Sequence, residues 1–384
     1  MRRLALLLCL APALFGQSVE ERLAKLEQEM REVRAENAEL RKQLAPAQPA
    51  PAPAAAPAPK AAAQEIKPGG KESRLLVGGF VQAQAESGDR TDTRLPDEND
   101  RVFLRRARLT LQGSFPEHFD FKAEVDAAGG LGSAAGVRAQ ATDVYIQWSP
   151  HKLAQVRAGQ FKTPYGYEQI FSDTRTLTIE RSLASDRVAL GRGIGVQLQG
   201  DAGPVSYAVG AFNGNGTNVT FNDDEGFLTI ARASITQWKR GDHDRWSIGV
   251  NGFTGQDHAA PAAPELGFTG NTFAGSRDAW GVDTQLIAGK LELWAEVLRA
   301  QYDPAAAGPT RELNGWYAGG GWMLTKKLQA VAMLDRLDAP SGDTRTFTLG
   351  GNYFIKGHDL KLQINFMHSN TDRTRVTARL QTLF

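Results

Sequence analysis

The sequence has almost no cysteine and no long apolar run, and these two absences exclude several classes of protein. Its single cysteine, Cys9, lies in a short apolar stretch near the N-terminus that we expect to be removed on export. The remaining chain then has no thiol for disulfide bonds or metal sites. No run reaches 18 apolar residues, which excludes a membrane protein built from helices. A membrane-spanning β-barrel is not excluded, because its strands are apolar at only every second residue.

An excess of charge of one sign is also missing. The 384 residues include 44 Lys and Arg against 43 Asp and Glu, which gives a formal net charge of +1. A chain so nearly balanced has no overall field that would attract nucleic acid or an acidic partner. We therefore expect no nucleic-acid binding.

Motifs for catalysis and for metal binding are missing as well. The six histidines are scattered along the chain, without an H-E-x-x-H pattern or any other paired metal spacing. No G-x-S-x-G nucleophile motif occurs, and Gly191, Gly193 and Gly195 alternate along one predicted strand instead of opening a helix around a phosphate. We predict that the protein is not an enzyme and that it binds no cofactor and no metal.

The first 17 residues have the pattern of a secretory signal peptide. Arg2 and Arg3 precede an apolar core from Leu4 to Phe15, and cleavage near Gly16 is consistent with the residues there. Twelve apolar residues are too few to cross a membrane as a helix. We therefore predict an exported protein.

Residues 18–45 have the heptad spacing of a short α-helical coiled coil. Apolar positions alternate steps of four and three, and Asn37 falls where a buried amide fixes the register of such helices. The segment is just under four heptads, so we expect it to need an oligomer for stability; the alternative is a lone solvated helix. Residues 46–73 begin with a run of Ala and Pro and are predicted to form an extended linker. The apolar and amide positions of the heptads are Val19, Leu23, Leu26, Met30, Val33, Asn37, Leu40 and Leu44.

Residues 74–384 alternate apolar and polar side chains with a period of two, which is typical of β-strands. Most strand candidates have the length that a tilted strand needs to cross a bilayer. We predict an all-β fold, a 16-stranded antiparallel transmembrane β-barrel. The sixteen candidates lie near 74–87, 101–113, 118–128, 138–148, 153–161, 191–200, 204–212, 227–239, 245–255, 278–288, 290–302, 312–324, 327–337, 344–355, 359–369 and 374–384.

The connections between these strands alternate between short and long. Seven short turns, such as Ser114–Glu117 and Lys356–His358, fall on one side, and eight mostly longer loops fall on the other. The longer loops include 256–277 and 338–343. This segregation is typical of an up-and-down barrel with both chain ends in the periplasm.

The alternation also assigns a face to each residue, and sixteen strands leave an aqueous lumen. In the last strand Val376, Ala378 and Leu380 form an apolar face that we assign to lipid, and Arg375 and Arg379 face inward. A soluble β-protein with its apolar face inside would give the same pattern. Aromatic residues near strand ends are predicted to form interfacial girdles: Trp148, Trp238, Trp246, Tyr353 and Phe384.

The second strand, V-F-L-R-R-A-R-L-T-L-Q, supplies most of the predicted inward charge. Strict alternation places Phe103 and Arg105 outward and Arg106 and Arg108 inward. Closure would bring the first and last strands together, so these arginines would form one cationic wall with Arg375 and Arg379, which favours anions. Other inward cations are Lys122, Arg157 and Lys361, and the inward carboxylates are Asp120, Glu124, Asp126, Asp143, Glu292 and Glu296, so the lumen is mixed in charge.

The connection from Lys162 to Leu190 is unusually long for a β-rich chain, and such connections are usually functional. Pro164 ends the preceding strand because it cannot donate to a sheet ladder. We predict that this loop folds back into the mouth of the barrel; the alternative is an ordinary surface loop with solvated charges. Its charged residues and their neighbours are Lys162, Arg175, Arg181, Arg187, Arg192, Glu168, Asp173, Glu180 and Asp186.

Several motifs resemble the phosphate-selective porin O/P family of bacterial outer membranes, over residues 74–384. They are R-R-A-R-L-T-L-Q-G, F-K-A-E-V-D, R-A-G-Q-F-K-T-P-Y-G-Y-E, T-I-E-R-S, Y-A-V-G-A-F-N-G-N-G, G-G-N-Y-F-I and R-L-Q-T-L-F. The resemblance implies a homotrimer of sixteen-stranded barrels, with a third external loop that narrows the pore and arginines that lead anions to lysines. It also implies that Phe384 is read by the barrel-assembly machinery. Lys162 is the only lysine between Lys152 and Lys239, so the sequence offers no cluster of constriction lysines there.

Together these observations predict a porin of the outer membrane that passes small anions such as phosphate, with its N-terminal segment in the periplasm. One alternative is a general or sugar-passing porin, although inward aromatics such as Tyr145 and Trp294 are few. Another is a tether that binds peptidoglycan through residues 18–44. The residues predicted to line the pore and bind anions are Arg106, Arg108, Lys122, Arg157, Lys162, Arg175, Arg181, Arg187, Arg375 and Arg379.

Overall fold

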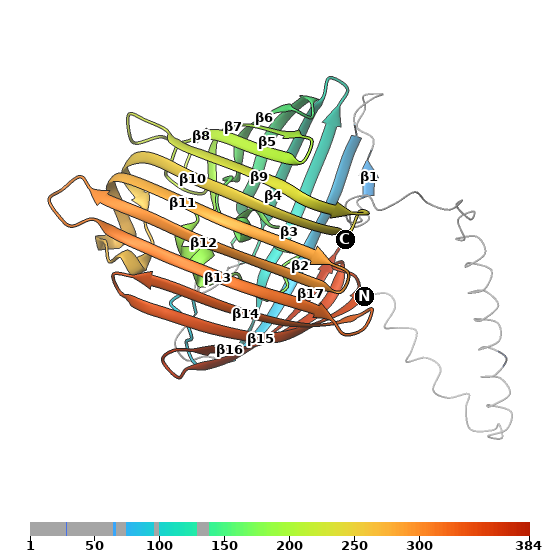
Figure 1. Cartoon of the computed structure of the whole chain (residues 1–384). Helices are drawn as coiled ribbons and strands as arrows, with labels where there is room; N and C mark the ends of the chain where they lie inside the picture. The colour runs from blue at the N-terminus through green and yellow to red at the C-terminus, as the bar shows by residue number, and fades with distance from the viewer. Residues whose placement is uncertain (1–27, 29–63, 67–73, 96–99, 129–137) are drawn as a thin grey trace, which may run out of the picture. The chain divides into compact units, whose positions relative to one another are not determined.

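The computed structural model of the protein describes residues 28, 64–66, 74–95, 100–128 and 138–384 (Figure 1). The chain divides into two units, residues 1–54 and 55–384, and every described residue except Gln28 belongs to the second unit. The predicted signal peptide, and all of the predicted coiled coil except Gln28, lie outside the described residues. Among the described residues, no helix is long and apolar enough to cross a membrane.

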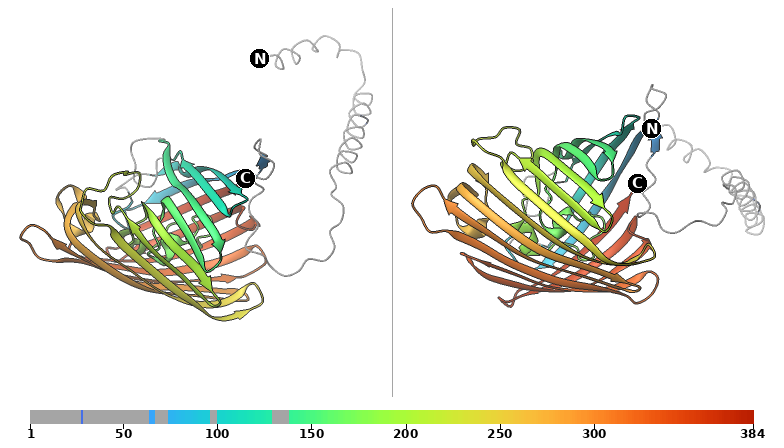
Figure 2. Two further views of the ribbon diagram at one scale, coloured as in Figure 1. Left: turned by 90° about the horizontal axis from the view of Figure 1, so that it is seen from above. Right: turned by 45° about the horizontal axis from the view of Figure 1, so that its top comes forward.

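The second unit is a closed antiparallel sheet, which confirms the predicted sixteen-stranded barrel. Each strand from β2 to β17 pairs with its neighbour in sequence, and β17 pairs with β2 to close the cylinder (Figures 1 and 2). The barrel strands are β2 (Arg74–Gly88), β3 (Arg101–Phe115), β4 (Phe119–Asp126), β5 (Gln140–His151), β6 (Ala154–Lys162), β7 (Arg192–Ala202), β8 (Val205–Phe212), β9 (Leu228–Arg240), β10 (Asp244–Pro261), β11 (Thr272–Ala288), β12 (Leu291–Pro304), β13 (Arg311–Met323), β14 (Leu328–Ala339), β15 (Gly342–Lys356), β16 (Leu360–Ser369) and β17 (Thr374–Leu383).

Phe384 and a short extra strand complete the closure of the barrel. The backbone of Phe384 exchanges two hydrogen bonds with Gly79 of β2, at 3.0 and 3.1 Å. A Cβ atom at Gly79 would lie 2.2 Å from the carbonyl oxygen of Arg108, so only glycine fits this close approach. Beyond the end of β17, β1 (Gln64–Ile66) pairs with Leu75–Val77 of β2. This strand falls within residues 46–73, which the sequence predicted to be a linker.

The connections segregate as predicted, with short turns at one end of the barrel and longer loops at the other. We call residues 163–191 loop L3; it contains α2 (Tyr167–Ile170) and α3 (Leu183–Val188). Loop L1 joins β2 to β3, and loop L5 (262–271) joins β10 to β11 through η1 (Pro264–Leu266) and η2 (Thr269–Asn271). The expected loops at 256–277 and 338–343 are shorter than predicted, because the flanking strands continue and pair as far as Pro261 with Thr272 and Ala339 with Gly342.

The outer surface of the barrel is apolar and the inner surface is polar. In β17 Val376 and Leu380 are exposed on the outside, whereas Arg375 and Arg379 are buried inside. This confirms the predicted faces of the last strand. Exposed aromatic side chains lie near the short-turn end, as a girdle at a membrane interface would: Phe115, Phe119, Trp148, Trp238, Trp246, Trp322, Tyr353 and Phe384.

One half of the interior is filled by L3 (Figure 2). Helix α3 packs against β12, β13 and β14. Leu183 and Val188 of this helix share a buried cluster with inward side chains of the wall, among them Met333 and Leu337. Strand β14 therefore carries apolar residues on both faces, because one face meets L3 and the other forms the outer surface.

A β-bulge in β3 overturns two of the predicted side-chain directions. The register shifts between Gln82 and Ala83, whose partners are Arg106 and Leu104, so Arg105 has no partner of its own on β2. The extra residue reverses the alternation beyond it. Arg105 consequently turns inward to contact L3, and Phe103 lies half-buried under the guanidinium of Arg101 at 4.1 Å.

A charge on the outer surface should reveal which part of it meets lipid. Ile364 is exposed in the middle of β16, and Val102 is exposed beside the long loop before β3. We expect Ile364→Arg to lower the free energy of unfolding from lipid vesicles by about 2–4 kcal/mol, and Val102→Arg by at most about 1 kcal/mol, because the penalty falls toward the interface. Tryptophan fluorescence during urea titration measures both values. Equal costs at the two positions would contradict a lipid-facing apolar band.

Candidate functional site

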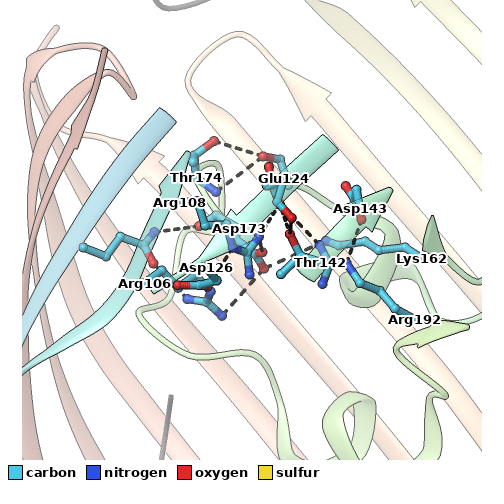
Figure 3. A network of polar contacts seen from close by, with 12 residues as sticks. Arg106, Arg108, Glu124, Asp126, Thr142, Asp143, Lys162, Asp173, Thr174 and Arg192 are labelled. Carbon is cyan, nitrogen blue, oxygen red and sulfur yellow. Dashed lines mark hydrogen bonds and ion pairs between the residues drawn. The ribbon is translucent and has the colours of Figure 1, made fainter. Parts of the chain in front are cut away.

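The carboxylate of Asp173 in L3 lies among four cationic side chains inside the barrel. Arg108 of β3 contacts it at 2.6 Å, Arg106 at 3.6 Å and Lys162, at the end of β6, at 3.9 Å. Arg181, also in L3, donates a further hydrogen bond to it. Figure 3 shows Asp173 between the arginines of β3 and the lysine of β6. L3 is thus tied electrostatically to β3 and β6.

A second carboxylate of L3, Glu180, occupies an equivalent position beside the barrel seam. Its two oxygens accept hydrogen bonds from Nε and Nη2 of Arg105, both at 2.9 Å, and Nη2 of Arg379 donates at 2.6 Å. Arg379 also donates two hydrogen bonds to Gln84 of β2. Arg106, Arg108 and Arg379 of the predicted wall therefore lie near the junction of β17, β2 and β3 and contact carboxylates of L3. Arg375 instead pairs with Glu86 of β2.

The network continues from Arg108 along the neighbouring strands β4, β5 and β7 through alternating charges (Figure 3). Arg108 contacts Asp126 at 2.8 Å and Glu124 at 3.4 Å, and Glu124 contacts Lys122 at 3.1 Å. Asp143 then joins Lys122 at 2.7 Å to Arg192 at 2.6 Å. Over the two clusters, eight cations face five carboxylates, which leaves an excess of three positive charges on the described residues: Arg105, Arg106, Arg108, Lys122, Lys162, Arg181, Arg192 and Arg379 against Glu124, Asp126, Asp143, Asp173 and Glu180.

The cations control the ionisation of the L3 carboxylates. Burial opposes the charge of Asp173, but the fields of Arg106 and Arg181 outweigh it and hold the pKa of that carboxyl well below its usual value. Burial also opposes the charge of Glu180, but Arg105 and Arg379 outweigh it and lower the pKa of that carboxyl. Both groups are therefore anionic at neutral pH, and each ion pair remains intact there.

Polar side chains of the barrel satisfy the backbone of L3. Asn352 donates to the carbonyl oxygen of Leu177 at 3.0 Å, and Lys361 donates to that of Thr176 at 3.0 Å. Lys361 is the second residue of β16, immediately after a short turn, so L3 descends almost to the short-turn end of the barrel. The carboxylate of Asp335 in β14 accepts hydrogen bonds from the first two amides of α3, which would otherwise be unpaired.

Loops L1 and L5 hold the outer side of L3. Arg94 of L1 contacts Asp186 of L3 at 2.7 Å and donates to the carbonyl oxygen of Arg181 at 2.9 Å. Arg187 of L3 contacts Glu265 of L5 at 2.8 Å. Burial opposes the charge of Arg94 as well, and Asp92 and Asp186 nevertheless raise the pKa of its guanidinium well above the usual value. Loops L1, L3 and L5 are thus bonded to one another at the long-loop end of the barrel.

The structure places the ten residues predicted to line the pore in different environments. Arg106, Arg108, Arg375 and Arg379 are buried, and Arg375 contacts Glu86 at 3.5 Å and the carbonyl oxygen of Asp89 at 2.8 Å. Lys122, Lys162, Arg181 and Arg187 are half-buried in the contacts described above. Arg157 and Arg175 are half-buried without a carboxylate within 4 Å among the described residues. Lys122, Lys162 and Lys361 each bind a separate acceptor, whereas Lys290, Lys326 and Lys327 line one space near the short turns.

Open space remains on the side of the lumen that L3 leaves free. A cavity of about 480 Å³ lies between L3, through Pro164 and Ile170, and the wall around β5 to β9. A second space of about 520 Å³ lies below Leu177 of L3, among the short turns at the ends of β11 to β15. The free side of L3 therefore faces open space at β5 to β9.

Several residues that hold L3 could not be identified from the sequence. Asp335, Glu265 and Arg94 each contact L3 from a distant part of the chain, and no spacing rule links them to it. Buried aromatics are also more numerous than predicted, because Phe253, Tyr317 and others pack beneath L3. The one available signal was in β14, where alternate residues that should face a water-filled lumen are apolar.

A closed sixteen-stranded barrel with an apolar exterior, a charged lumen and an inward-folded third loop is the architecture of an outer-membrane porin. A family model described as phosphate-selective porin O and P matches residues 76–382, and the chain belongs to this family. No curated protein matches the chain in sequence.

Solved porin structures share the fold at low sequence identity. A loop L8 deletion mutant of OmpT, an outer membrane protein of Vibrio cholerae, has a TM-score of 0.60 at 11% identity, over 82% of this chain and 100% of its own. OmpF of Salmonella typhi, in complex with daunomycin, has a TM-score of 0.54 at 7% identity, over 84% of this chain and 100% of its own. OprB of Pseudomonas putida has a TM-score of 0.53 at 12% identity, over 82% of this chain and 94% of its own. These likenesses establish the fold alone.

Removing the carboxylate of Asp173 should release L3. In Asp173→Asn four cations lose their shared counterion, and we expect the docked loop to be destabilised by about 3–5 kcal/mol. Single-channel conductance in a planar bilayer should rise, and selectivity should shift toward anions. Asp242→Asn, the same change at an exposed short turn, should alter neither. A conductance unchanged by Asp173→Asn would mean that L3 does not depend on this contact.

Acid should also release L3. Because the pKa values of Asp173 and Glu180 are lowered, the docked loop loses stability as the pH falls. A carboxyl whose pKa is depressed by docking stabilises the docked loop above its undocked pKa, about 4, and loses that contribution as the pH falls further. We expect an increase in conductance below about pH 4. The variant Asp173→Asn/Glu180→Gln should lack this acid step. A step of equal size in that variant would contradict the assignment to these two carboxyls.

Proposed function

We propose that the protein is a passive channel for small anions in the outer membrane and that it catalyses no reaction. The observation that carries this proposal is the excess of three positive charges in the network between L3 and the barrel wall. Because the passage beside L3 is narrow and has low-dielectric walls, this excess lowers the barrier for anions and raises it for cations.

Phosphate is the particular anion that the family description suggests. The arginines around Asp173 and Glu180 support passage of an oxyanion, because guanidinium groups match such ligands with paired hydrogen bonds. The separation of Lys122, Lys162 and Lys361 onto different acceptors argues for moderate selectivity. A general porin that passes solutes of either sign is therefore the alternative, favoured by the close pairing of most charges in the network.

The assembly and orientation follow as parts of the same proposal. One of the OmpT structures is a trimer form, with a TM-score of 0.56 at 10% identity over 82% of this chain and 100% of its own, and we propose a homotrimer. Strand β2 begins, and β17 ends, at the short-turn end of the barrel. Since short turns of such barrels face the periplasm, the N-terminal segment would lie there, where peptidoglycan is within its reach.

The reversal potential under a potassium chloride gradient tests the proposal. We expect wild-type channels to pass chloride more readily than potassium, and Arg106→Gln/Arg108→Gln to move this ratio toward one, because the network then loses two cations. Arg299→Gln is the matched control, since Arg299 lies on the outer surface and pairs with Glu312 at 2.7 Å. A wild-type ratio at or below one would reject an anion channel and leave a general porin.

A further inference from the structure

The cavity beside L3 contains an arginine that the charge network does not use. Arg157 of β6 lines this cavity, and no carboxylate lies within 4 Å of it among the described residues. Its Nε and Nη2 atoms both donate to the Oε1 atom of Gln147, at 2.8 and 2.5 Å. Its guanidinium also lies over the ring of Tyr145, 4.4 Å from the centroid, and 5.4 Å from that of Phe161. The side chain is therefore positioned without being neutralised.

The other charged residues of the cavity lining have partners, and the exposed Asp201 is bound only by the hydroxyl of Ser206. Arg232 pairs with both carboxylate oxygens of Asp283, at 2.7 and 2.8 Å, and Asp143 pairs with Lys122 and Arg192. Lys162 donates to a carbonyl oxygen of L3 and lies 3.9 Å from Asp173. Arg157 is thus the one cation of the cavity lining that has no carboxylate partner among the described residues. This favours a monoanion over a dianion, which would need a second free cation.

Neutral hydrogen-bonding groups surround Arg157. Four glutamines on β5, β6 and β7 bond to one another, with Gln199 donating to Gln155 at 3.3 Å and Gln197 donating to Gln199 at 2.6 Å. Gln155, Gln197 and Gln199 all line the cavity. The Oε1 atom of Gln197 has no hydrogen-bond partner among the described residues, although the side chain is buried. Amides of this kind donate to and accept from hydroxyl groups, so the wall suits a polar, hydroxylated solute.

We propose that Arg157 and these glutamines form a binding site for small hydroxylated carboxylates, such as sugar acids, on the passage past L3. The guanidinium binds the carboxylate, the amides bind the hydroxyl groups, and the ring of Tyr145 provides an apolar surface for the carbon chain. L3 is hydrogen-bonded to β2, β3, β6, β10 to β12 and β14 to β17, which leaves the wall around β5 and β7 to β9 as the path for a solute that passes it. This inference rests on the proposed function, and it adds a solute class that the arginines around Asp173 do not specify.

Block of the single-channel current by gluconate, compared with propionate, tests the site. Both probes are monocarboxylates, and only gluconate carries hydroxyl groups. We expect gluconate to reduce the wild-type current in a saturable way at lower concentration than propionate. Arg157→Gln should raise the half-blocking concentration about tenfold, because a charged hydrogen bond is lost, and Arg157→Lys should restore part of the block.

Two control variants make the result specific. Arg245→Gln removes an arginine that also donates to a glutamine, Gln285 at 3.2 Å, but that does not line the cavity, and it should leave the block unchanged. Gln199→Leu should weaken the block by gluconate and leave that by propionate unaltered. Equal block of the wild type and Arg157→Gln would overturn the site, and equal block by the two probes would overturn its preference for hydroxyl groups. The block is measured from the total current. The test of this site therefore does not depend on the chloride-to-potassium ratio, which tests the proposed function.

Discussion

The contact between Asp173 and its four surrounding cations is the interaction on which the rest of the structure depends. A carboxylate moved from water into a barrel lumen loses hydration, and only close opposite charges compensate that loss. Three arginines of the barrel, Arg105, Arg106 and Arg379, also lose hydration there, and among the described residues the carboxylates within 4 Å of them belong to L3. The carboxylates of L3 and the cations of the wall neutralise one another, so the loop folds inward.

This arrangement divides the lumen into two unlike halves. On one side L3 is packed on apolar side chains of β12 to β14 and hydrogen-bonded to β15, β16 and β17, which removes that half from the solute path. On the other side a wall of glutamines faces the open cavity together with Arg157, which has no carboxylate within 4 Å among the described residues. The described charges beside the loop leave a small positive surplus, so this part of the lumen is mixed in charge rather than uniformly basic.

The strand order and the two faces of the barrel could be predicted from sequence, because a period of two is a local property that a membrane enforces on every strand. Arg106, Arg108 and Arg379 were placed inward for the same reason. Arg105 was not placed inward, because a single extra residue in β3 shifts the register and no local pattern in the sequence indicates this shift. Asp335 and Glu265 could not be linked to L3 either, since their contacts join segments far apart in the chain. Strand β1 was missed because three residues are too few to show a period.

The position of L3 inside the barrel is the central claim, and crosslinking tests it most directly. The amide of Gln381 donates to the carbonyl oxygen of Thr174 at 3.0 Å, so the tip of the loop lies against β17 near its end. In the variant Thr174→Cys/Gln381→Cys, a short bifunctional thiol reagent should join the two positions within one chain and leave the single-channel conductance unchanged. A folded channel that does not crosslink, or whose conductance changes when the two positions are joined, would contradict a loop that already rests there.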